Sequence, residues 1–232
     1  MSFLILVRHG QSIWNLEKKF TGWVDIDLTE EGELEAKKAG LLIKNKNINI
    51  DFYYTSLQLR ANNTLKIIQK ILNDKKSFTK AWQLNERHYG ALTGLNKIEM
   101  SKKIGEDKVL EFRRSWDTKP EKLSKESPYH PLNIFAYKEV PKEVIPDTES
   151  LKDTYQRVLK YFEEEIQKKL ISNNILISAH GNSIRALCKY LFDLDNNQIS
   201  KLEVPTGNPL IIELDEKSKI VNCEYLDKER AK

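Results

Sequence analysis

The chain has 232 residues, with 38 Lys and Arg against 34 Asp and Glu, which gives a formal net charge of +4. A hydrophobic fraction of 40% excludes an intrinsically disordered chain, and this length can bury a core without disulfide bonds. Two cysteines exclude a disulfide scaffold and a four-cysteine zinc site. So mild a positive charge does not by itself indicate binding to nucleic acid.

The N-terminal part predicts strands alternating with helices. Residues 3–7 form an apolar run that is typical of a buried parallel strand. Because Arg8 follows at once, the run is too short for a signal peptide or a membrane span, and we expect a cytoplasmic protein. Thr29 is typical of a helix N-cap, since acidic residues follow it. A second strand over residues 50–55 and an amphipathic helix over residues 61–72 come next.

The C-terminal part repeats this alternation. It predicts a helix over 155–170, a strand over 175–179, a helix through 186–190 and a strand over 210–214. The order predicts an α/β fold, a three-layer sandwich with a largely parallel central sheet flanked by helices. Residues 95–150 interrupt the order with a charged helical pattern and five prolines. We interpret them as a lid-like insertion in a single domain of residues 1–232, with a short tail at about 223–232.

Two of the predicted strands end in the same way. One runs into His9 and Gly10, and the other runs into His180 and Gly181. Ligands bind at the carboxyl ends of strands in open α/β sheets, so neighbouring strands would bring the two histidines face to face. The chain has only four histidines, and two in matching contexts favour a functional site over two structural side chains.

Arginine marks the candidate anion site, because most of the basic residues in this chain are lysines and only eight are arginines. A guanidinium group binds phosphate or carboxylate through two parallel hydrogen bonds. A neutral imidazole beside arginine is a nucleophile, and such a pocket suits phosphoryl transfer. Gly10 would let a backbone N–H approach a phosphate. We interpret Arg157 and Arg230 as ordinary surface charges, because each lies among Lys and Glu.

Two alternatives to an anion-binding catalytic site are weaker. A metal site would use both histidines with Glu86 as a third ligand, but no HxH, HExxH or CxxC spacing supports it. Neighbouring arginines also disfavour a cation. A nucleic-acid module needs interleaved aromatic and basic stretches, whereas the basic residues here gather in motifs. We therefore predict no metal, no nucleic-acid partner and no membrane partner.

Longer motifs surround the candidate residues and carry a resemblance. They lie at residues 8–15, 20–23, 27–32, 84–92, 94–97, 113–116, 179–187 and 205–209. Arg8-His9-Gly10 resembles the signature of the histidine phosphatase superfamily. The run Glu86-Arg87-His88-Tyr89-Gly90, together with Arg113-Arg114, is similar to the cofactor-dependent phosphoglycerate mutases. The resemblance covers roughly residues 3–215.

This resemblance implies a mutase that interconverts 3-phosphoglycerate and 2-phosphoglycerate in glycolysis and gluconeogenesis through a phosphohistidine. His9 would be the nucleophile, Glu86 the general acid and base, and His180 the residue that stabilises the transferring phosphoryl group. Arg8 and Arg60 would clamp that group. The rest of the small phosphorylated three-carbon acid would be held by Gly10, Gln11, Ser12, Asn15, Thr21, Gly22, Arg87, Tyr89, Lys97, Arg113, Arg114, Gly181 and Asn182.

The resemblance also implies 2,3-bisphosphoglycerate as the cofactor that keeps His9 phosphorylated, with no metal. A phosphomonoester phosphatase on the same fold is the second hypothesis, since water can replace the sugar acid as acceptor. Asn15, Lys97, Arg113 and Arg114 favour the mutase, because a broad phosphatase would not need them. A bisphosphoglycerate mutase stays open, and so does the choice between a monomer, a dimer and a tetramer.

Overall fold

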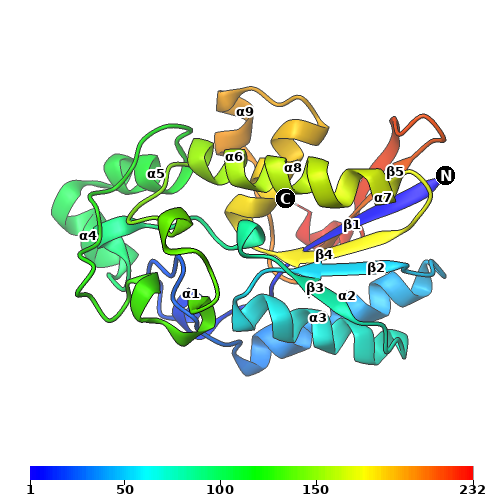
Figure 1. The fold of residues 1–232 in the computed structure, drawn as a ribbon, viewed down its shortest axis with the longest axis horizontal. Helices are drawn as coiled ribbons and strands as arrows, with labels where there is room; N and C mark the ends of the chain where they lie inside the picture. Colours follow the sequence, from blue (N-terminus) through cyan, green and yellow to red (C-terminus); the bar gives the residue numbers. More distant parts are fainter. Residues whose placement is uncertain (232) are drawn as a thin grey trace.

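A mixed six-stranded sheet forms the centre of the protein in a computed structural model that describes residues 1–231 (Figure 1). The strand order is β3-β2-β4-β1-β5-β6. The bounds are β1 Ser2–Arg8, β2 Phe52–Thr55, β3 Phe78–Lys80, β4 Ile175–Ala179, β5 Pro209–Leu214 and β6 Ile220–Tyr225. Strands β3, β2, β4 and β1 pair in parallel, while β5 pairs antiparallel with both β1 and β6. The prediction of a largely parallel sheet is therefore confirmed.

Helices cover both faces of the sheet, as a three-layer sandwich requires (Figure 1). One face carries α2 Glu30–Asn45 and α3 Leu59–Leu72, and the other carries α6 Leu151–Tyr161, α7 Gln167–Leu170 and α8 Gly181–Leu191. Successive residues of a strand point to opposite faces. Leu4 and Leu6 of β1 accordingly join the core under α6 and α8, whereas Ile5 and Val7 join the core under α2 and α3. Burial on both faces explains the unbroken apolar run from residue 3 to residue 7 of β1.

Local signals in the sequence set several helix starts. The Thr29 side chain accepts a hydrogen bond from the Gly32 N–H at the start of α2, as predicted for an N-cap. Ser150 and Asp153 form a reciprocal capping box at the start of α6. Helix α8 begins directly after β4, so the first turn of α8 lies at the carboxyl end of that strand. This connection delivers backbone N–H groups to the edge of the sheet where the two histidines lie.

The insertion lies beyond the carboxyl ends of the parallel strands (Figure 1). It contains α4 Lys97–Ile104, α5 Glu106–Arg114 and the 3-10 turns Pro131–Asn133, Phe135–Tyr137 and Lys142–Val144. The short helix α1 Ile13–Leu16 lies on the same side of the sheet. A small separate core around Phe20, Leu92 and Val109 packs this region against the residues that follow β1.

The C-terminal segment differs from the expected tail at about 223–232. The expected tail begins inside β6, which follows the short helix α9 Asn196–Lys201 and strand β5. Beyond β6, Asp227 pairs with Lys38 of α2 at 2.6 Å, and Arg230 pairs with Glu35 of the same helix at 2.8 Å. The interpretation of Arg230 as an ordinary surface charge is therefore wrong. Across residues 1–231, no helix is both long and apolar enough to span a membrane.

Candidate active site

The two strand-end histidines lie side by side. In the pairing of β1 with β4, Arg8 is opposite Ala179, so the residues that follow each strand are neighbours. The His9 N–H donates to the Ala179 carbonyl at 3.0 Å. The ring centroids of His9 and His180 are 5.0 Å apart, and both side chains are buried. The matching strand-to-glycine contexts thus produce a facing pair.

His9 has one ring nitrogen committed and one free for chemistry. Its Nδ1 lies 2.7 Å from the Gly10 carbonyl oxygen, which can only accept, so Nδ1 carries the hydrogen and Nε2 keeps its lone pair. Burial lowers the pKa of His9 well below the usual range, and the positive charges of Arg60 and Arg8 lower it further. The side chain is therefore a neutral imidazole with a nucleophilic Nε2.

His180 is held in a similar way from the opposite side. Its Nε2 lies 2.8 Å from Ser56 Oγ, whereas Nδ1 is buried without a hydrogen-bond partner within residues 1–231. Burial lowers the pKa of His180 first, and Arg60 and His9 add to the effect. Ser56 is a contact that sequence reasoning missed, although it directly follows β2 at the same edge of the sheet.

Two arginines flank the histidines, of which Arg60 is buried and Arg8 is partly buried. Arg60, from the first turn of α3, donates to the carbonyl oxygens of Val24 and Gly22 at 2.9 Å each. Arg8 donates from Nη1 to the Val204 carbonyl at 2.7 Å, and its buried Nε has no partner within residues 1–231. Burial lowers the pKa of both guanidinium groups. A bound anion would offset this desolvation cost, so the pair is prepared for a phosphate.

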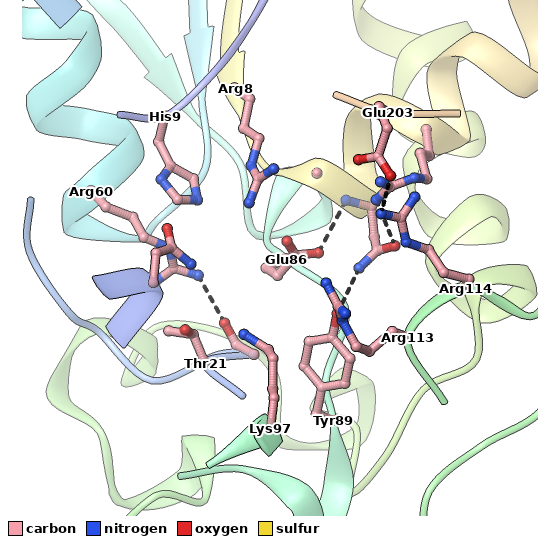
Figure 2. Close-up of a pocket in the computed structure, with 15 residues that line it drawn as sticks. Arg8, His9, Thr21, Arg60, Glu86, Tyr89, Lys97, Arg113, Arg114 and Glu203 are labelled. Atoms are coloured by element: carbon pink, nitrogen blue, oxygen red, sulfur yellow. Dashed lines mark hydrogen bonds and ion pairs between the residues drawn. The ribbon is translucent and has the colours of Figure 1, made fainter. Parts of the chain in front are cut away.

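A cavity of about 130 Å³ opens in front of these side chains. Figure 2 shows the labelled side chains pointing into a common space, with His9 and Arg60 on one side, Lys97 and Arg113 across from them, and Glu86 between. Positive charge dominates the lining, since Glu86 and Glu203 are its only acids. The full lining is Arg8, His9, Asn15, Thr21, Gly22, Arg60, Glu86, Tyr89, Lys97, Arg113, Arg114, Gly181, Asn182, Arg185 and Glu203.

Glu86 places a carboxyl group at the centre of the cavity, between the labelled cationic side chains (Figure 2). Its Oε1 accepts hydrogen bonds from the backbone N–H of Arg87 at 2.8 Å and of Asn182 at 3.2 Å. The second of these donors lies in the first turn of α8, where helix N–H groups are free to bind an acceptor. The Asn182 side chain in turn donates to the Tyr89 hydroxyl at 3.1 Å. The carboxyl group is therefore fixed from two sides while it faces the cavity.

Some predicted residues lie away from the cavity lining. Arg87 is fully buried, and its guanidinium group donates to the carbonyl oxygens of Glu149, Phe112 and Thr118. Gln11 lines an adjoining depression that also includes Lys18 and Ser101. Gly10, Ser12 and His180 do not line the cavity either.

Close packing against α2 requires a glycine at position 10. An added Cβ would lie 2.1 Å from the Gly32 carbonyl oxygen of α2, so any larger residue would collide with backbone. The Gly10 N–H donates to Thr64 Oγ1 at 3.0 Å. That N–H is therefore not available to a phosphate, contrary to the expectation from sequence.

Two lining residues were missed as site residues. Arg185 of α8 donates to the Leu202 carbonyl at 2.9 Å, and burial lowers its pKa to about 10. The scarcity of arginine in this sequence is the signal that would have found it. Glu203 pairs with Arg114 at 2.6 Å, and no local pattern marks it, because it depends on the packing of the segment before β5. Within residues 1–231 no three His, Cys, Asp or Glu side chains are grouped so as to hold a metal ion.

An α/β sheet that holds a neutral histidine between the buried Arg60 and the partly buried Arg8 is suited to phosphoryl chemistry. The sequence model of the histidine phosphatase superfamily (branch 1) matches residues 4–224. The chain therefore belongs to the histidine phosphatase superfamily.

Curated relatives are similar over nearly the whole chain. A protein of Pelagibacter ubique (strain HTCC1062), named 2,3-bisphosphoglycerate-dependent phosphoglycerate mutase, is 68% identical over 100% of this chain and 98% of its own length. A protein of the same name from Borreliella burgdorferi (strain ZS7) is 47% identical over 97% of this chain and 92% of its own. A solved structure described as a putative alpha-ribazole-5'-P phosphatase from Escherichia coli matches 100% of both chains with a TM-score of 0.71 and 17% identity. That likeness concerns the fold.

Proposed function

We propose that this protein is a 2,3-bisphosphoglycerate-dependent phosphoglycerate mutase that interconverts 3-phosphoglycerate and 2-phosphoglycerate through a phosphohistidine at His9. The names of relatives that are 68% and 47% identical support this assignment. One structural observation supports the assignment independently of these names. A neutral histidine lies between the buried Arg60 and the partly buried Arg8 on one side of the cavity, and Lys97, Arg113 and Arg114 line the same cavity. The first group suits a transferring phosphoryl group, and the second suits the remaining anionic groups of a phosphorylated acid.

His9 acts as the nucleophile. Its Nε2 attacks phosphorus as the bond from phosphorus to the departing oxygen breaks, and the phosphoryl group passes to the imidazole. Arg8 and Arg60 neutralise the charge on the equatorial oxygens, which is the main demand of phosphoryl transfer. His180 lies next to His9 with its Nδ1 unpaired, and the Ser56 hydroxyl can donate to Nε2, so a neutral ring can carry its hydrogen on Nδ1 and donate it toward the same oxygens.

Glu86 moves the proton. It protonates the hydroxyl oxygen that leaves phosphorus, and it later removes the proton from the hydroxyl group that attacks the phosphohistidine. Its hydrogen bonds from Arg87 N–H and Asn182 N–H hold the carboxyl group toward the cavity. The positioned acid–base group is worth about 10²–10⁴-fold in rate.

The donor set fits 2,3-bisphosphoglycerate. A molecule with two phosphates and a carboxylate needs cations at both ends of its site, and Arg8 and Arg60 lie opposite Lys97 and Arg113 (Figure 2). The unpaired buried Nε of Arg8 is a further donor without a protein acceptor within residues 1–231. When bound, the bisphosphate supplies the phosphoryl group that loads His9. The residues around it hold its other phosphate and its carboxylate in place.

The proposal extends to location and to partners. Phosphorylated three-carbon acids are multiply charged and do not cross a hydrocarbon layer unaided, so we assign the reaction to the cytoplasm, in glycolysis and gluconeogenesis. The partners are these small acids. The chemistry needs no residue from another subunit, since every proposed role is filled by this chain.

The direct test measures the phosphorus-containing products themselves. Protein treated with EDTA is mixed with 3-phosphoglycerate, with and without a trace of 2,3-bisphosphoglycerate, and 31P NMR resolves 2-phosphoglycerate from inorganic phosphate. We expect 2-phosphoglycerate to form in EDTA and its rate to rise with the bisphosphate. Release of inorganic phosphate without 2-phosphoglycerate would instead identify a phosphatase.

A further inference from the structure

A buried ion pair lies behind the active site. Glu149 precedes the N-cap of α6, and Arg157 follows two turns later on that helix. Arg157 Nε lies 2.7 Å from Glu149 Oε1, and Nη2 lies 3.0 Å from Oε2, so the guanidinium and the carboxylate form a two-pronged contact. The side chains are only 9% and 5% exposed. The interpretation of Arg157 as a surface charge is therefore wrong.

The remaining hydrogen bonds of Arg157 converge on one short segment. Nη1 donates to the carbonyl oxygens of Gln83 at 2.6 Å and Asn85 at 3.0 Å, and Nη2 donates to the carbonyl oxygen of Glu86 at 3.0 Å. Residues 83–86 carry the proposed proton donor. Every hydrogen bond that this guanidinium makes thus goes either to Glu149 or to the backbone that carries Glu86.

Glu149 binds the other end of the same segment. Its Oε2 accepts from the His88 N–H at 2.8 Å, and its own N–H donates to the His88 carbonyl at 3.0 Å. Its carbonyl accepts from Arg87 Nε at 3.0 Å. Arg157 and Glu149 therefore hydrogen-bond to the chain on both sides of Glu86, from residue 83 to residue 88.

This segment needs such support, because it lacks regular hydrogen bonding. Beyond the 3-10 turn Trp82–Leu84 it belongs to no helix or strand, and buried backbone groups in such a segment must find other partners. The Glu86 N–H donates to Gln58 Oε1 at 3.0 Å, and the Glu86 carbonyl accepts from Arg157. Both backbone groups of the proposed acid are thus fixed by side chains that lie outside the cavity lining.

We propose that Arg157 and Glu149 are positioning residues that set the place of the Glu86 carboxyl group for proton transfer. The inference rests on the proposed function, in which Glu86 protonates the leaving oxygen as the phosphorus–oxygen bond breaks and the bond from His9 Nε2 to phosphorus forms. A buried ion pair contributes little stability over well-packed apolar residues, so stability is a weak reason for this pair. The contacts of the pair instead indicate that it fixes the position of residues 83–88.

The test separates proton donation from every other contribution by changing the leaving group. The alkoxide of a phosphoglycerate is a poor leaving group and needs the proton from Glu86, whereas p-nitrophenolate leaves as a stable anion and does not. Both 2,3-bisphosphoglycerate and p-nitrophenyl phosphate transfer a phosphoryl group to the same His9. The measured quantity is the ratio of the two single-turnover rates of His9 phosphorylation.

Arg157→Lys keeps the charge but loses the fork that reaches three carbonyl oxygens at once. We expect phosphorylation by the bisphosphate to fall by about 10²-fold, the size of effect that a shift of about 1 Å produces, while phosphorylation by the aryl phosphate changes little. A second variant, Arg157→Met with Glu149→Gln, removes both charges and leaves neither buried alone. This double variant should lower the same ratio, and it provides the test if the first variant does not fold.

Two controls make the result decisive. Leu170→Ala lies in α7, at the far end of the helical run that carries Arg157, and removes core volume from a buried side chain, so it should lower the unfolding midpoint without changing the ratio. Glu86→Gln should collapse the ratio by itself. If Glu86→Gln lowers the ratio and the Arg157 variants lower both rates equally or neither, the positioning role is wrong. If Glu86→Gln leaves the ratio intact, the proposed acid role fails, and the inference fails with it.

Discussion

The cavity has two walls that are built in different ways. We call His9, Arg8 and Arg60 the floor, together with His180, which packs against His9 without lining the cavity, because the four lie at the carboxyl ends of β1 and β4 and in the first turn of α3. We call Lys97, Arg113 and Arg114 the insertion wall, because they come from α4 and α5. Each of the four floor residues hydrogen-bonds to another protein group: Arg8 to the Val204 carbonyl, His9 to the Gly10 carbonyl, His180 to Ser56 Oγ and Arg60 to the Val24 carbonyl. The insertion wall lies in a region joined to the sheet through a small separate core.

The difference separates chemistry from recognition. In the proposed mechanism the floor contacts the phosphoryl group, and it would serve any phosphate ester whose remainder fitted the cavity. The insertion wall would meet the remainder of the substrate and so would decide which ester is held in line with His9. Rigid sheet ends suit the first task, since small displacements of the nucleophile are costly. A variable insertion suits the second task, because it can change without disturbing the floor.

The largest expected effect comes from removing the nucleophile from the floor. His9→Ala should lower phosphorylation by any substrate, alkyl or aryl, by at least about 10⁴-fold, because loss of a nucleophile that works with its neighbours removes the covalent route. The insertion wall is untouched, so binding of 3-phosphoglycerate should persist in an equilibrium titration. Turnover close to that of the wild type would rule out covalent catalysis at His9.

A smaller and more selective effect should follow from a change in the insertion wall. Arg113→Ala removes a cation that would bind the carboxylate or second phosphate, a charge-assisted contact worth about 1.5–3 kcal/mol, so KM for 3-phosphoglycerate should rise by about 10- to 100-fold. Phosphorylation by p-nitrophenyl phosphate should change little, because that substrate carries neither group.

Lys108→Ala is the matched control for this change. Lys108 lies on the same helix, but it is 48% exposed and pairs with Glu111 at 2.8 Å outside the cavity. An equal loss with Lys108→Ala would mean that the helix, rather than the Arg113 charge, carries the effect. An equal loss with both substrates would erase the distinction between floor and insertion wall.

The floor was the predictable half of the site. Strands β1 and β4 carry apolar runs at residues 3–7 and 175–177 because both faces of the sheet are covered, and these runs are visible in the sequence. Once the strands are placed, the position of the two histidines follows from topology alone. The chemical roles of these residues did not follow from topology. They came from the resemblance of the longer motifs to a known family. The edge strands were missed, since β3 has three residues and β6 is largely exposed, so neither shows a buried apolar run.

The supports of the site were not predictable from local pattern. Arg157 lies among charged residues in the sequence, yet its partners are carbonyl oxygens about 70 residues away, as with Gln83 at a separation of 74. Within the insertion, Asp147 contacts the buried His130 at 3.2 Å, and no local pattern marks this pair either. Hydrogen bonds between distant segments depend on tertiary packing, and no period or motif in one stretch of chain encodes them.

The smallest predicted effect concerns pH and again separates the walls. Burial, followed by the positive charges of Arg113 and Arg8, lowers the pKa of Lys97 to about 8. As pH rises through 8 the ammonium of the free enzyme loses its proton and the insertion wall loses a charge, so KM should rise by up to about tenfold per pH unit. Bound substrate anions favour the ammonium form, so kcat should stay level to higher pH. Arginine keeps its charge in this pH range, so in the Lys97→Arg variant KM should no longer rise above pH 8. A rise that persists in Lys97→Arg would assign the titration to another group and would leave the charge of Lys97 without a part in substrate binding.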